Sequence, residues 1–270
     1  MRIRAALKYL LHGPLNIGRG SFPYERSQVF FPRGSIIFRA ACAEGIYEAD
    51  VRRVLLTLVK PGTWYFDIGA NIGLLSLPVL ANMPDVHVLS AEPSQSSLPF
   101  LKRTWEVSAW KDRWHLEHRA INDTPGEVTF SVAEPSMGAF EGMRDTSRAG
   151  TAREVKVPAT TLDHVWQEQG RPRVSAVKID IEGAETLALR GAKELIAKER
   201  PCLILEWNRM NLAAYEIPAG SLAEWAAEQN YIVRTIPGFI PVLTPQDLAL
   251  QSLLGESFLL YPAERSPLAR

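Results

Sequence analysis

Residues 66–73 read Phe-Asp-Ile-Gly-Ala-Asn-Ile-Gly and decide the fold, because an apolar run ends there in an acid and a glycine-studded turn. The apolar stretch 74–80 follows directly. This order is typical of a buried strand that turns into a helix. Glycines let the backbone approach a ligand, and the first turn of a helix carries unpaired N–H groups. We therefore predict a nucleotide cofactor site at this turn.

A second acid follows the next apolar run. Residues 86–91 lead into Glu92, which stands about 20 residues beyond Gly73. The second strand of a nucleotide-binding βαβ unit is expected to end there, and a carboxylate at that point can accept hydrogen bonds from both ribose hydroxyls. The order of acid, turn, helix, strand and acid is more demanding than glycines alone. The alternative is a tight turn that binds nothing.

Two classes of cofactor use such a layout. Dinucleotide-binding proteins usually carry G-x-G-x-x-G, with the pyrophosphate at the helix N-terminus. Here the spacing is Gly69-x-Asn71-x-Gly73, and Asp67 stands two positions before the first glycine. A carboxylate would repel a pyrophosphate but suits a cofactor that carries an ammonium and a sulfonium group. The pattern favours S-adenosylmethionine over a dinucleotide.

A second informative block spans residues 174–208. One buried strand is predicted to end at Asp180, a helix follows, and another buried strand ends at Glu206. Together with the first block, this pattern resembles the FkbM-type family of S-adenosylmethionine-dependent methyltransferases. The resemblance rests on motifs in the expected order, namely Gly45 to Glu48, Asp67 to Gly73, Glu92-Pro93, Lys178 to Glu185 and Leu189 to Ala192. Leu74-Leu75 is a departure, because relatives often have an aromatic residue after the turn.

The resemblance extends over roughly residues 45–263 and implies a fold. That fold is α/β, with the Rossmann-like and mostly parallel sheet of class I methyltransferases and an antiparallel C-terminal strand. We expect a methyltransferase domain at 46–270. Residues 1–45 would form a small N-terminal extension made of a helix and a hairpin.

The resemblance also implies which residues bind the cofactor. The turn after the first strand would hold the methionine and ribose side, and Glu92 would hold the ribose hydroxyls. The segment after the third strand would contact the adenine, and two residues before the first strand would close the pocket. The implied set is Tyr47, Glu48, Asp67, Gly69, Asn71, Gly73, Glu92, Ala120 and Ile121.

Catalysis needs a base near the acceptor hydroxyl, because a neutral alcohol is a poor nucleophile. Asp180 follows a predicted strand at the sheet edge where open α/β proteins bind ligands, so it is the first candidate for the base or for orienting the acceptor. Glu182 in the next turn and Glu206 on the opposite wall complete the catalytic set. Lys178 projects on the same side as Asp180 and could pair with a carboxylate. These acids could instead hold Mg²⁺, which we do not favour because no histidine or tight acid pair demands a metal.

The remaining apolar runs predict the order of elements. Strands at 64–68, 86–91, 114–120, 175–180 and 202–207 alternate with helices, which indicates a parallel sheet covered on both faces. Two further strands at 231–236 and 257–261 have no clear long helix between them, which permits an antiparallel last strand. Near the start, the pattern predicts a hairpin of 29–31 with 36–38 around Pro-Arg-Gly-Ser, and a helix at 50–60.

An insertion departs from simple alternation. Residues 128–132 and 154–158 predict an added β pair, with 133–153 between them. A loop of this length without its own structure is uncommon unless it is a lid or is disordered, so we predict a substrate lid. The alternative is a mobile surface loop with solvated arginines. In a lid, three apolar residues would pack over the acceptor and three arginines would contact acidic or hydroxylated groups: Met137, Phe140, Met143, Arg144, Arg148 and Arg153.

Composition narrows the class of protein. Thirty basic and 30 acidic residues give a formal net charge of zero, so no excess of positive charge attracts nucleic acid, and we expect no nucleic-acid partner. Two cysteines, Cys42 and Cys202, lack metal-binding spacing, which favours a reducing, cytoplasmic compartment. No run reaches the roughly 20 apolar residues of a membrane helix. Residues 1–11 are basic and partly apolar; a peripheral membrane contact is the less favoured interpretation, after a helix that packs on its own domain or a partner subunit.

The leading hypothesis is O-methylation of a hydroxyl on a sugar, a glycan or a polyketide-like small molecule, with S-adenosylmethionine as the methyl donor. A nucleotide-dependent oxidoreductase is the first alternative. A non-catalytic cofactor-binding module is the second. An oligomer is compatible with the sequence.

Overall fold

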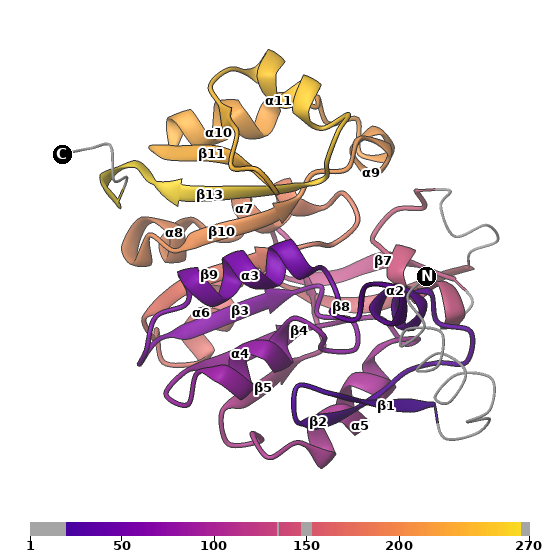
Figure 1. Ribbon diagram of the computed structural model, residues 1–270. Helices are drawn as coiled ribbons and strands as arrows, with labels where there is room; N and C mark the ends of the chain where they lie inside the picture. The colour runs from indigo at the N-terminus through magenta and orange to yellow at the C-terminus, as the bar shows by residue number, and fades with distance from the viewer. Residues whose placement is uncertain (1–19, 134, 147–152, 266–270) are drawn as a thin grey trace.

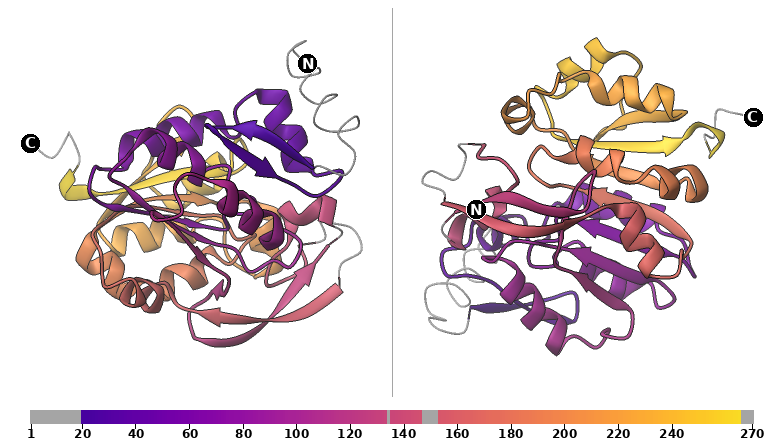
Figure 2. Two further views of the ribbon diagram at one scale, coloured as in Figure 1. Left: turned by 90° about the horizontal axis from the view of Figure 1, so that it is seen from below. Right: turned by 180° about the vertical axis from the view of Figure 1, so that it is seen from behind.

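The computed structural model describes residues 20–133, 135–146 and 153–265 of the 270-residue chain. An eight-stranded sheet in the order β12-β11-β13-β10-β9-β3-β4-β5 forms the centre, with helices on both faces (Figures 1 and 2). Its five neighbouring parallel strands are β10 (Cys202–Glu206), β9 (Val174–Ile179), β3 (Trp64–Ile68), β4 (His87–Ala91) and β5 (Trp114–Glu117).

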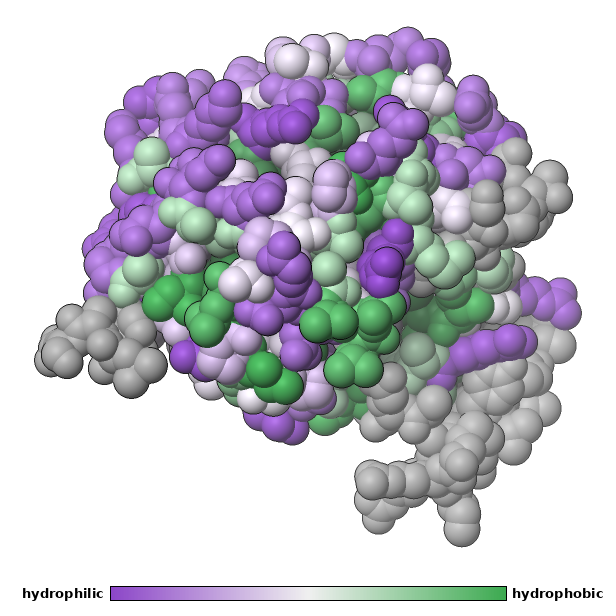
Figure 3. Space-filling view, turned by 90° about the horizontal axis from the view of Figure 1, so that it is seen from above, coloured by the Kyte–Doolittle hydropathy of each residue, from purple (hydrophilic) through white to green (hydrophobic). Residues whose placement is uncertain are grey.

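The C-terminal strands reverse direction. β13 (Ser257–Pro262) lies antiparallel to both β10 and β11 (Tyr231–Ile236), and β12 (Pro241–Val242) completes the edge. The antiparallel C-terminal strand and the Rossmann-like sheet of class I methyltransferases are therefore confirmed. The outer C-terminal elements expose several large hydrophobic side chains, namely Phe239, Ile240, Leu243, Leu250, Leu253 and Leu254. Figure 3, which views the molecule from above, shows hydrophobic groups interspersed among hydrophilic ones on this side.

The sheet separates two hydrophobic cores. β9 is buried along its whole length, as a central strand covered on both faces should be. One core lies under α2 to α5: α2 (Ile36–Glu44), α3 (Ala49–Leu58), α4 (Ser76–Asn82) and α5 (Leu98–Val107). The other lies under the later helices: α6 (Leu162–Glu168), α7 (Glu185–Arg190), α8 (Lys193–Glu199), α9 (Arg209–Ala214), α10 (Ser221–Glu228) and α11 (Pro245–Gln251). The strands β3, β4, β9, β10, β11 and β13 thus contribute side chains to both cores.

The topology creates one natural ligand site. β4 and β5 extend the sheet on one side of β3, whereas β9 and β10 extend it on the other. The carboxyl ends of β3 and β9 therefore meet where the strand order reverses, and open α/β sheets bind ligands at such a switch point. The acids predicted after these strands are brought to the same edge.

The predicted N-terminal hairpin was wrong in position. The hairpin joins β1 (Ser21–Tyr24) to β2 (Ser27–Phe30), and Glu25 and Arg26 take the positive φ angles of 44° and 60° that a tight hairpin turn requires. Residues 36–38 begin α2 instead of forming a strand. Ser35 caps that helix by accepting a hydrogen bond from the Phe38 N–H at 3.3 Å, so the segment predicted as a turn is a helix start.

The third predicted strand was also too long. β5 ends at Glu117, because Arg119 folds back and its backbone N–H and guanidinium donate to that carboxylate. Ala120–Ile121, β6, joins a separate sheet with β8 (Arg153–Thr160) and β7 (Gly126–Val132). β7 and β8 pair antiparallel, which confirms the added β pair.

The insertion has structure of its own where it is described. Pro135–Phe140 forms the 3-10 helix η2, and Arg148 lies outside the described residues. Residues 1–11, considered for membrane contact, also lie outside them. Within the described ranges, no helix combines the length and hydropathy needed to cross a membrane. Cys42 and Cys202 are both buried, and they are not joined in a disulfide.

Candidate functional site

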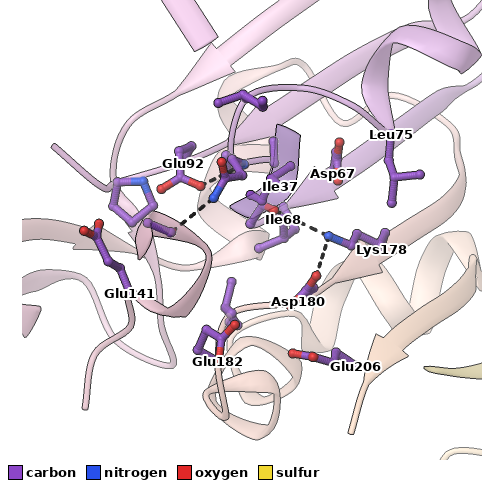
Figure 4. Close-up of a pocket in the computed structure, with 18 of the residues that line it drawn as sticks. Ile37, Asp67, Ile68, Leu75, Glu92, Glu141, Lys178, Asp180, Glu182 and Glu206 are labelled. Carbon is purple, nitrogen blue, oxygen red and sulfur yellow. Dashed lines mark hydrogen bonds and ion pairs between the residues drawn. The ribbon is translucent and has the colours of Figure 1, made fainter. Parts of the chain in front are cut away.

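A cavity of about 360 Å³ lies at the switch point, at the carboxyl edge of the sheet (Figure 4). Its wall comes from the turns after β3, β4, β9 and β10, from β6, and from α2 and η2. Of the site residues predicted from sequence, Gly73 is not part of the lining. The structure brings all the others together around this one cavity: Tyr47, Glu48, Asp67, Gly69, Asn71, Glu92, Ala120, Ile121, Asp180, Glu182 and Glu206.

The two glycines of the turn serve packing. Gly69 has φ +80°, and a Cβ there would meet the Asp180 carbonyl oxygen at 1.8 Å. Gly73 has φ +90°, and a Cβ there would lie 3.0 Å from the Trp114 ring and 3.1 Å from Leu101. The missing side chains face the neighbouring strand and the core. Gly69 thus lets the turn after β3 approach the end of β9, and Gly73 lets it pack on Trp114 and Leu101, which is a different reason from the ligand approach that the sequence suggested.

Asp67 is completely buried at the end of β3. Its Oδ2 accepts a hydrogen bond from Ser76 Oγ at 2.5 Å, and Ser76 Oγ lies 2.7 Å from Ser90 Oγ. Burial raises the pKa of Asp67, although the charge of Lys178 opposes that shift. Asp67 ties the start of α4 to its strand and contributes negative potential to the cavity that it lines.

Glu92 is fixed by two backbone donors. Its Oε2 accepts from the Asn71 N–H at 2.9 Å and its Oε1 from the Ser94 N–H at 2.8 Å. Asn71 has φ 50°, a left-handed conformation that aims its N–H at the carboxylate, and its Nδ2 donates to the Gly138 carbonyl of η2 at 3.1 Å. Burial raises the pKa of Glu92 to about 7. Each carboxylate oxygen keeps a second acceptor position, so Glu92 can still bind a diol.

Lys178 is the cation at the centre of the site. It is 6% exposed, and its Nζ lies 2.9 Å from Asp180 Oδ2 and 3.4 Å from the Gly69 carbonyl oxygen (Figure 4). Burial disfavours the charged amine, but the nearby carboxylates outweigh burial and raise the pKa of Lys178. The pairing predicted for this lysine is confirmed. The ion pair orients Asp180 and favours its ionised form.

Asp180, Glu182 and Glu206 form a compact acidic group. One oxygen from each lies within 4.8 Å of the others. Burial, followed by the charges of Asp180 and Glu182, raises the pKa of Glu206 well above its usual range. The group therefore favours a neutral Glu206 beside charged neighbours. Oxygen ligands in this arrangement could also hold a hard divalent cation such as Mg²⁺.

Tyr47 and Glu48 approach the cavity from the N-terminal side. Glu48 precedes α3 in a left-handed conformation, with φ 43° and ψ 59°, and its side chain makes no capping hydrogen bond. Burial raises the pKa of Glu48 to about 7, whereas Lys178 opposes the shift. Glu182 is a second acid in the left-handed region, with φ 56°. Sparsely populated backbone conformations therefore cluster at the cavity, as is common at functional sites.

Sequence reasoning missed several lining residues. Ile36, Ile37 and Ala40 come from α2, whose start was taken for a strand. Glu141 carries no motif, yet its Oε1 accepts from the Ala133 N–H at 2.9 Å and its Oε2 accepts from the Ser94 hydroxyl. The apolar pattern of 36–44 was the available signal for α2. Nothing local marks Glu141, because its partners are distant in the sequence.

The cavity is strongly acidic. Among the described residues that line it, the cations are Lys178 and Arg119, and Arg119 is already paired with Glu117 and Glu168. Within this described lining, Lys178 is left to balance a much larger set of acids: Glu48, Asp67, Glu92, Glu141, Asp180, Glu182 and Glu206. Such a cavity suits a ligand that carries positive charge. The ammonium and sulfonium groups of S-adenosylmethionine fit this set of carboxylates, whereas a negatively charged pyrophosphate does not.

The sheet order and the site at its switch point define a Rossmann-like fold with a ligand-binding cavity. The family described as Methyltransferase FkbM domain matches residues 67–231, more than half of the chain, so the chain belongs to that family. Family and fold together imply S-adenosylmethionine as the cofactor.

Two relatives are informative about the family. The 2-O-methyltransferase NoeI of Sinorhizobium fredii is 24% identical over 189 residues, which cover 64% of this chain and 74% of NoeI. The 31-O-demethyl-FK506 methyltransferase FkbM of Streptomyces tacrolimicus is 25% identical over 162 residues, which cover 50% of this chain and 62% of that protein. Among solved structures, a methyltransferase FkbM from Methylobacillus flagellatus has a TM-score of 0.46 at 15% identity, covering 83% of this chain and 54% of that one.

Proposed function

We propose that this chain transfers a methyl group from S-adenosylmethionine to a hydroxyl of a sugar, a glycan or a polyketide-like small molecule. The acid-lined cavity at the switch point carries the proposal, because it suits a cationic methyl donor and has a carboxylate placed for proton transfer. The names of two relatives specify O-methylation, at a 2-O position and at the 31-O position of FK506, which supports an oxygen acceptor.

The residues predicted to bind the cofactor would contact different parts of it. Glu92, held by two backbone N–H groups, would accept the ribose hydroxyls. Ala120 and Ile121 would cover the adenine, while Tyr47 and Glu48 would close the cavity. Asp67 would act through its charge, because its side chain is fully buried. When bound, S-adenosylmethionine supplies an electrophilic methyl group on a positively charged sulfur.

Asp180 is the proposed general base. Its carboxylate is oriented by Lys178 at 2.9 Å, and a base of this kind typically accelerates a reaction about 10² to 10⁴-fold. The proton of the acceptor hydroxyl would pass to Asp180 while the hydroxyl oxygen of the acceptor gains the methyl group. Glu182 and Glu206 lie beside Asp180 and would hold the acceptor from the other side. A neutral Glu206 could donate a hydrogen bond there, which a charged carboxylate could not.

The two alternative functions considered from the sequence are now supported to different degrees. Membership of the methyltransferase family and the acidic cavity disfavour a nucleotide-dependent oxidoreductase, because its pyrophosphate would meet several carboxylates. A non-catalytic binding module would retain the cavity without the chemistry. Methyl transfer to an offered acceptor separates that module from an enzyme.

Calorimetric titration with S-adenosylhomocysteine, with NAD⁺ as the comparison ligand, tests the proposal. We expect saturable binding of S-adenosylhomocysteine alone. Glu92→Gln should weaken it about tenfold, because a charged acceptor of hydrogen bonds is lost. The matched control Glu106→Gln changes an exposed glutamate on α5 and should leave binding unchanged. Binding of NAD⁺ with no binding of S-adenosylhomocysteine would overturn the proposal.

A further inference from the structure

A second recess lies beside the acidic cavity. It is a groove of about 740 Å³ between the β7–β8 sheet and the helices α7 and α10. Met143 lines both the groove and the cavity, and it is the residue that the two linings share. A molecule in the groove therefore lies next to the cavity, with Met143 between them.

The segment 141–144 forms a partition between the two recesses, which meet at Met143. On the cavity side, Glu141 accepts a hydrogen bond from the Ser94 hydroxyl. Gly142 accepts from the Ser131 N–H at 2.7 Å, and a Cβ on Gly142 would lie 3.0 Å from Glu182 Cβ. The partition thus packs directly against an acid of the candidate catalytic group.

The groove side of the partition is anchored by Arg144. Its Nη1 donates to the Ala214 carbonyl at 2.8 Å, and its guanidinium lies 5.0 Å from the centre of the Tyr215 ring. Both ends of the short segment are therefore tied to separate elements. Met143 is held between these two anchors.

The groove differs from the cavity in charge. Three exposed cations line it, Arg144, Lys156 and Arg190, against two exposed carboxylates, Glu127 and Glu216. None of the ion pairs between described residues joins these groups. Arg144 and Lys156 donate hydrogen bonds to the Ala214 carbonyl and the Thr129 hydroxyl, which are neutral groups, so their charge is available to an anion from solution. The cavity on the other side of Met143 is dominated by acids.

The groove also offers flat and polar surfaces. Tyr215 and Trp225 are half-buried and present rings, and Asn122, Thr129 and Ser221 supply amide and hydroxyl groups. Aromatic walls with a few placed polar groups are typical of sites for small organic ligands. A sugar presents both an apolar face and hydroxyls, so it matches this lining.

We infer that this groove binds the methyl acceptor and that the acceptor is an anionic carbohydrate, a sugar that carries a carboxylate or a phosphate. The inference rests on the proposed function. The charged substituent lies among Arg144, Lys156 and Arg190, and one hydroxyl reaches past Met143 toward Asp180. The hydroxyl proton passes to Asp180, an O–C bond forms, and the C–S bond of the donor breaks with its electron pair kept by sulfur.

Titration of three probes in the presence of S-adenosylhomocysteine tests the inference: trigalacturonic acid, glucose 1-phosphate and neutral maltotriose. We expect at least one anionic probe to bind about tenfold more tightly than maltotriose, and its affinity to fall with added salt. The double variant Lys156→Glu/Arg190→Glu should lose that preference. Lys102→Glu, the same change at an exposed lysine on α5, should keep it.

The outcomes separate this inference from the proposed function, because S-adenosylhomocysteine binding is measured on its own in every variant and also reports folding of the cavity. Preference for trigalacturonic acid or for glucose 1-phosphate identifies a carboxylate or a phosphate as the recognised group. Equal binding of maltotriose, binding of none of the probes, or an unchanged preference in the double variant overturns the inference alone. Anion-selective binding without S-adenosylhomocysteine binding keeps the groove as a carbohydrate site and overturns its role in methyl transfer.

Discussion

The two edges of the central sheet differ sharply, although the same strands build both. At the carboxyl edge, β3, β4 and β9 lead into buried carboxylates and residues with positive φ such as Asn71 and Glu182. At the amino edge, Trp64 stacks on His87 and His115 at 4.9 and 4.6 Å between ring centres, and His87 Nδ1 lies 3.2 Å from His115 Nε2. Buried carboxylates gather at the carboxyl edge, and stacked aromatic and imidazole rings occupy the amino edge. That contrast marks the carboxyl edge as the functional one.

The largest expected effect is on turnover at the carboxyl edge. Asp180→Asn keeps the shape of the side chain but removes the base, so kcat should fall about 10² to 10⁴-fold. Affinity for S-adenosylhomocysteine should stay close to that of the wild type. The measurement is methyl transfer to an accepted substrate, with Asp112→Asn, an exposed aspartate, as control. Full activity of Asp180→Asn would show that Asp180 is not the general base.

Lys178→Met should produce the largest loss of stability at this edge. The change leaves Asp180 and the buried Asp67 without their central cation, and breaking a buried ion pair costs about 3 kcal/mol or more. Urea unfolding measures the loss, and Lys102→Met at an exposed position should be neutral. An unchanged unfolding midpoint would mean that the lysine does not balance these acids.

Protonation should stabilise the carboxyl edge. The folded pKa of Glu92 is raised to about 7 from an ordinary value of 4.5, so the folded state binds more protons between these values. The free energy of unfolding should therefore be highest below pH 4.5 for this group and fall as the pH rises through 7, by about 3 kcal/mol. Glu92→Gln should flatten that dependence. A wild-type free energy of unfolding that rises between pH 5 and 8 because of Glu92 would contradict this prediction.

The amino edge should respond to pH in the opposite direction, and more weakly. Burial lowers the pKa of His87 and of His115 below 6.5 in the folded state, so the unfolded state binds more protons as the pH drops below 6.5. This contribution to stability is present above pH 6.5 and is lost below it. In the variant His87→Gln/His115→Gln, unfolding curves at pH 7.5 and 5.5 should show less acid destabilisation than the wild type. Equal acid destabilisation of the variant and the wild type would exclude the two histidines as its cause.

The sequence was sufficient to place the ends of β3, β9 and β10 to within a residue and to predict that the acids there meet at one edge of the sheet. Asp67, Asp180 and Glu206 follow apolar runs, and the alternation of strands with helices brings the ends of parallel strands to one edge, so their proximity was predictable. The local pattern did not explain Gly69, whose need for a missing side chain arises from the Asp180 carbonyl on another strand.

Other features could not be read locally. The run Ile36 to Phe38 is compatible with a strand or a helix, and only the cap at Ser35 and the contact with the cavity select α2. The hydrogen bond from the Ser94 hydroxyl to Glu141 joins segments far apart in the chain, and the partition at Met143 depends on contacts of the same kind. Tertiary contacts determine these positions, and the periodicity of apolar residues in the sequence does not indicate them.

Hydrogen exchange with and without S-adenosylhomocysteine tests the contrast between the two edges most directly. We expect slower amide exchange after ligand binding in residues 67–75, 92–97 and 178–183 at the carboxyl edge. Exchange in residues 85–88 and 113–116 at the amino edge should stay unchanged. Protection of the amino edge alone, or of neither edge at saturating ligand, would contradict the assignment of the acidic cavity as the cofactor site.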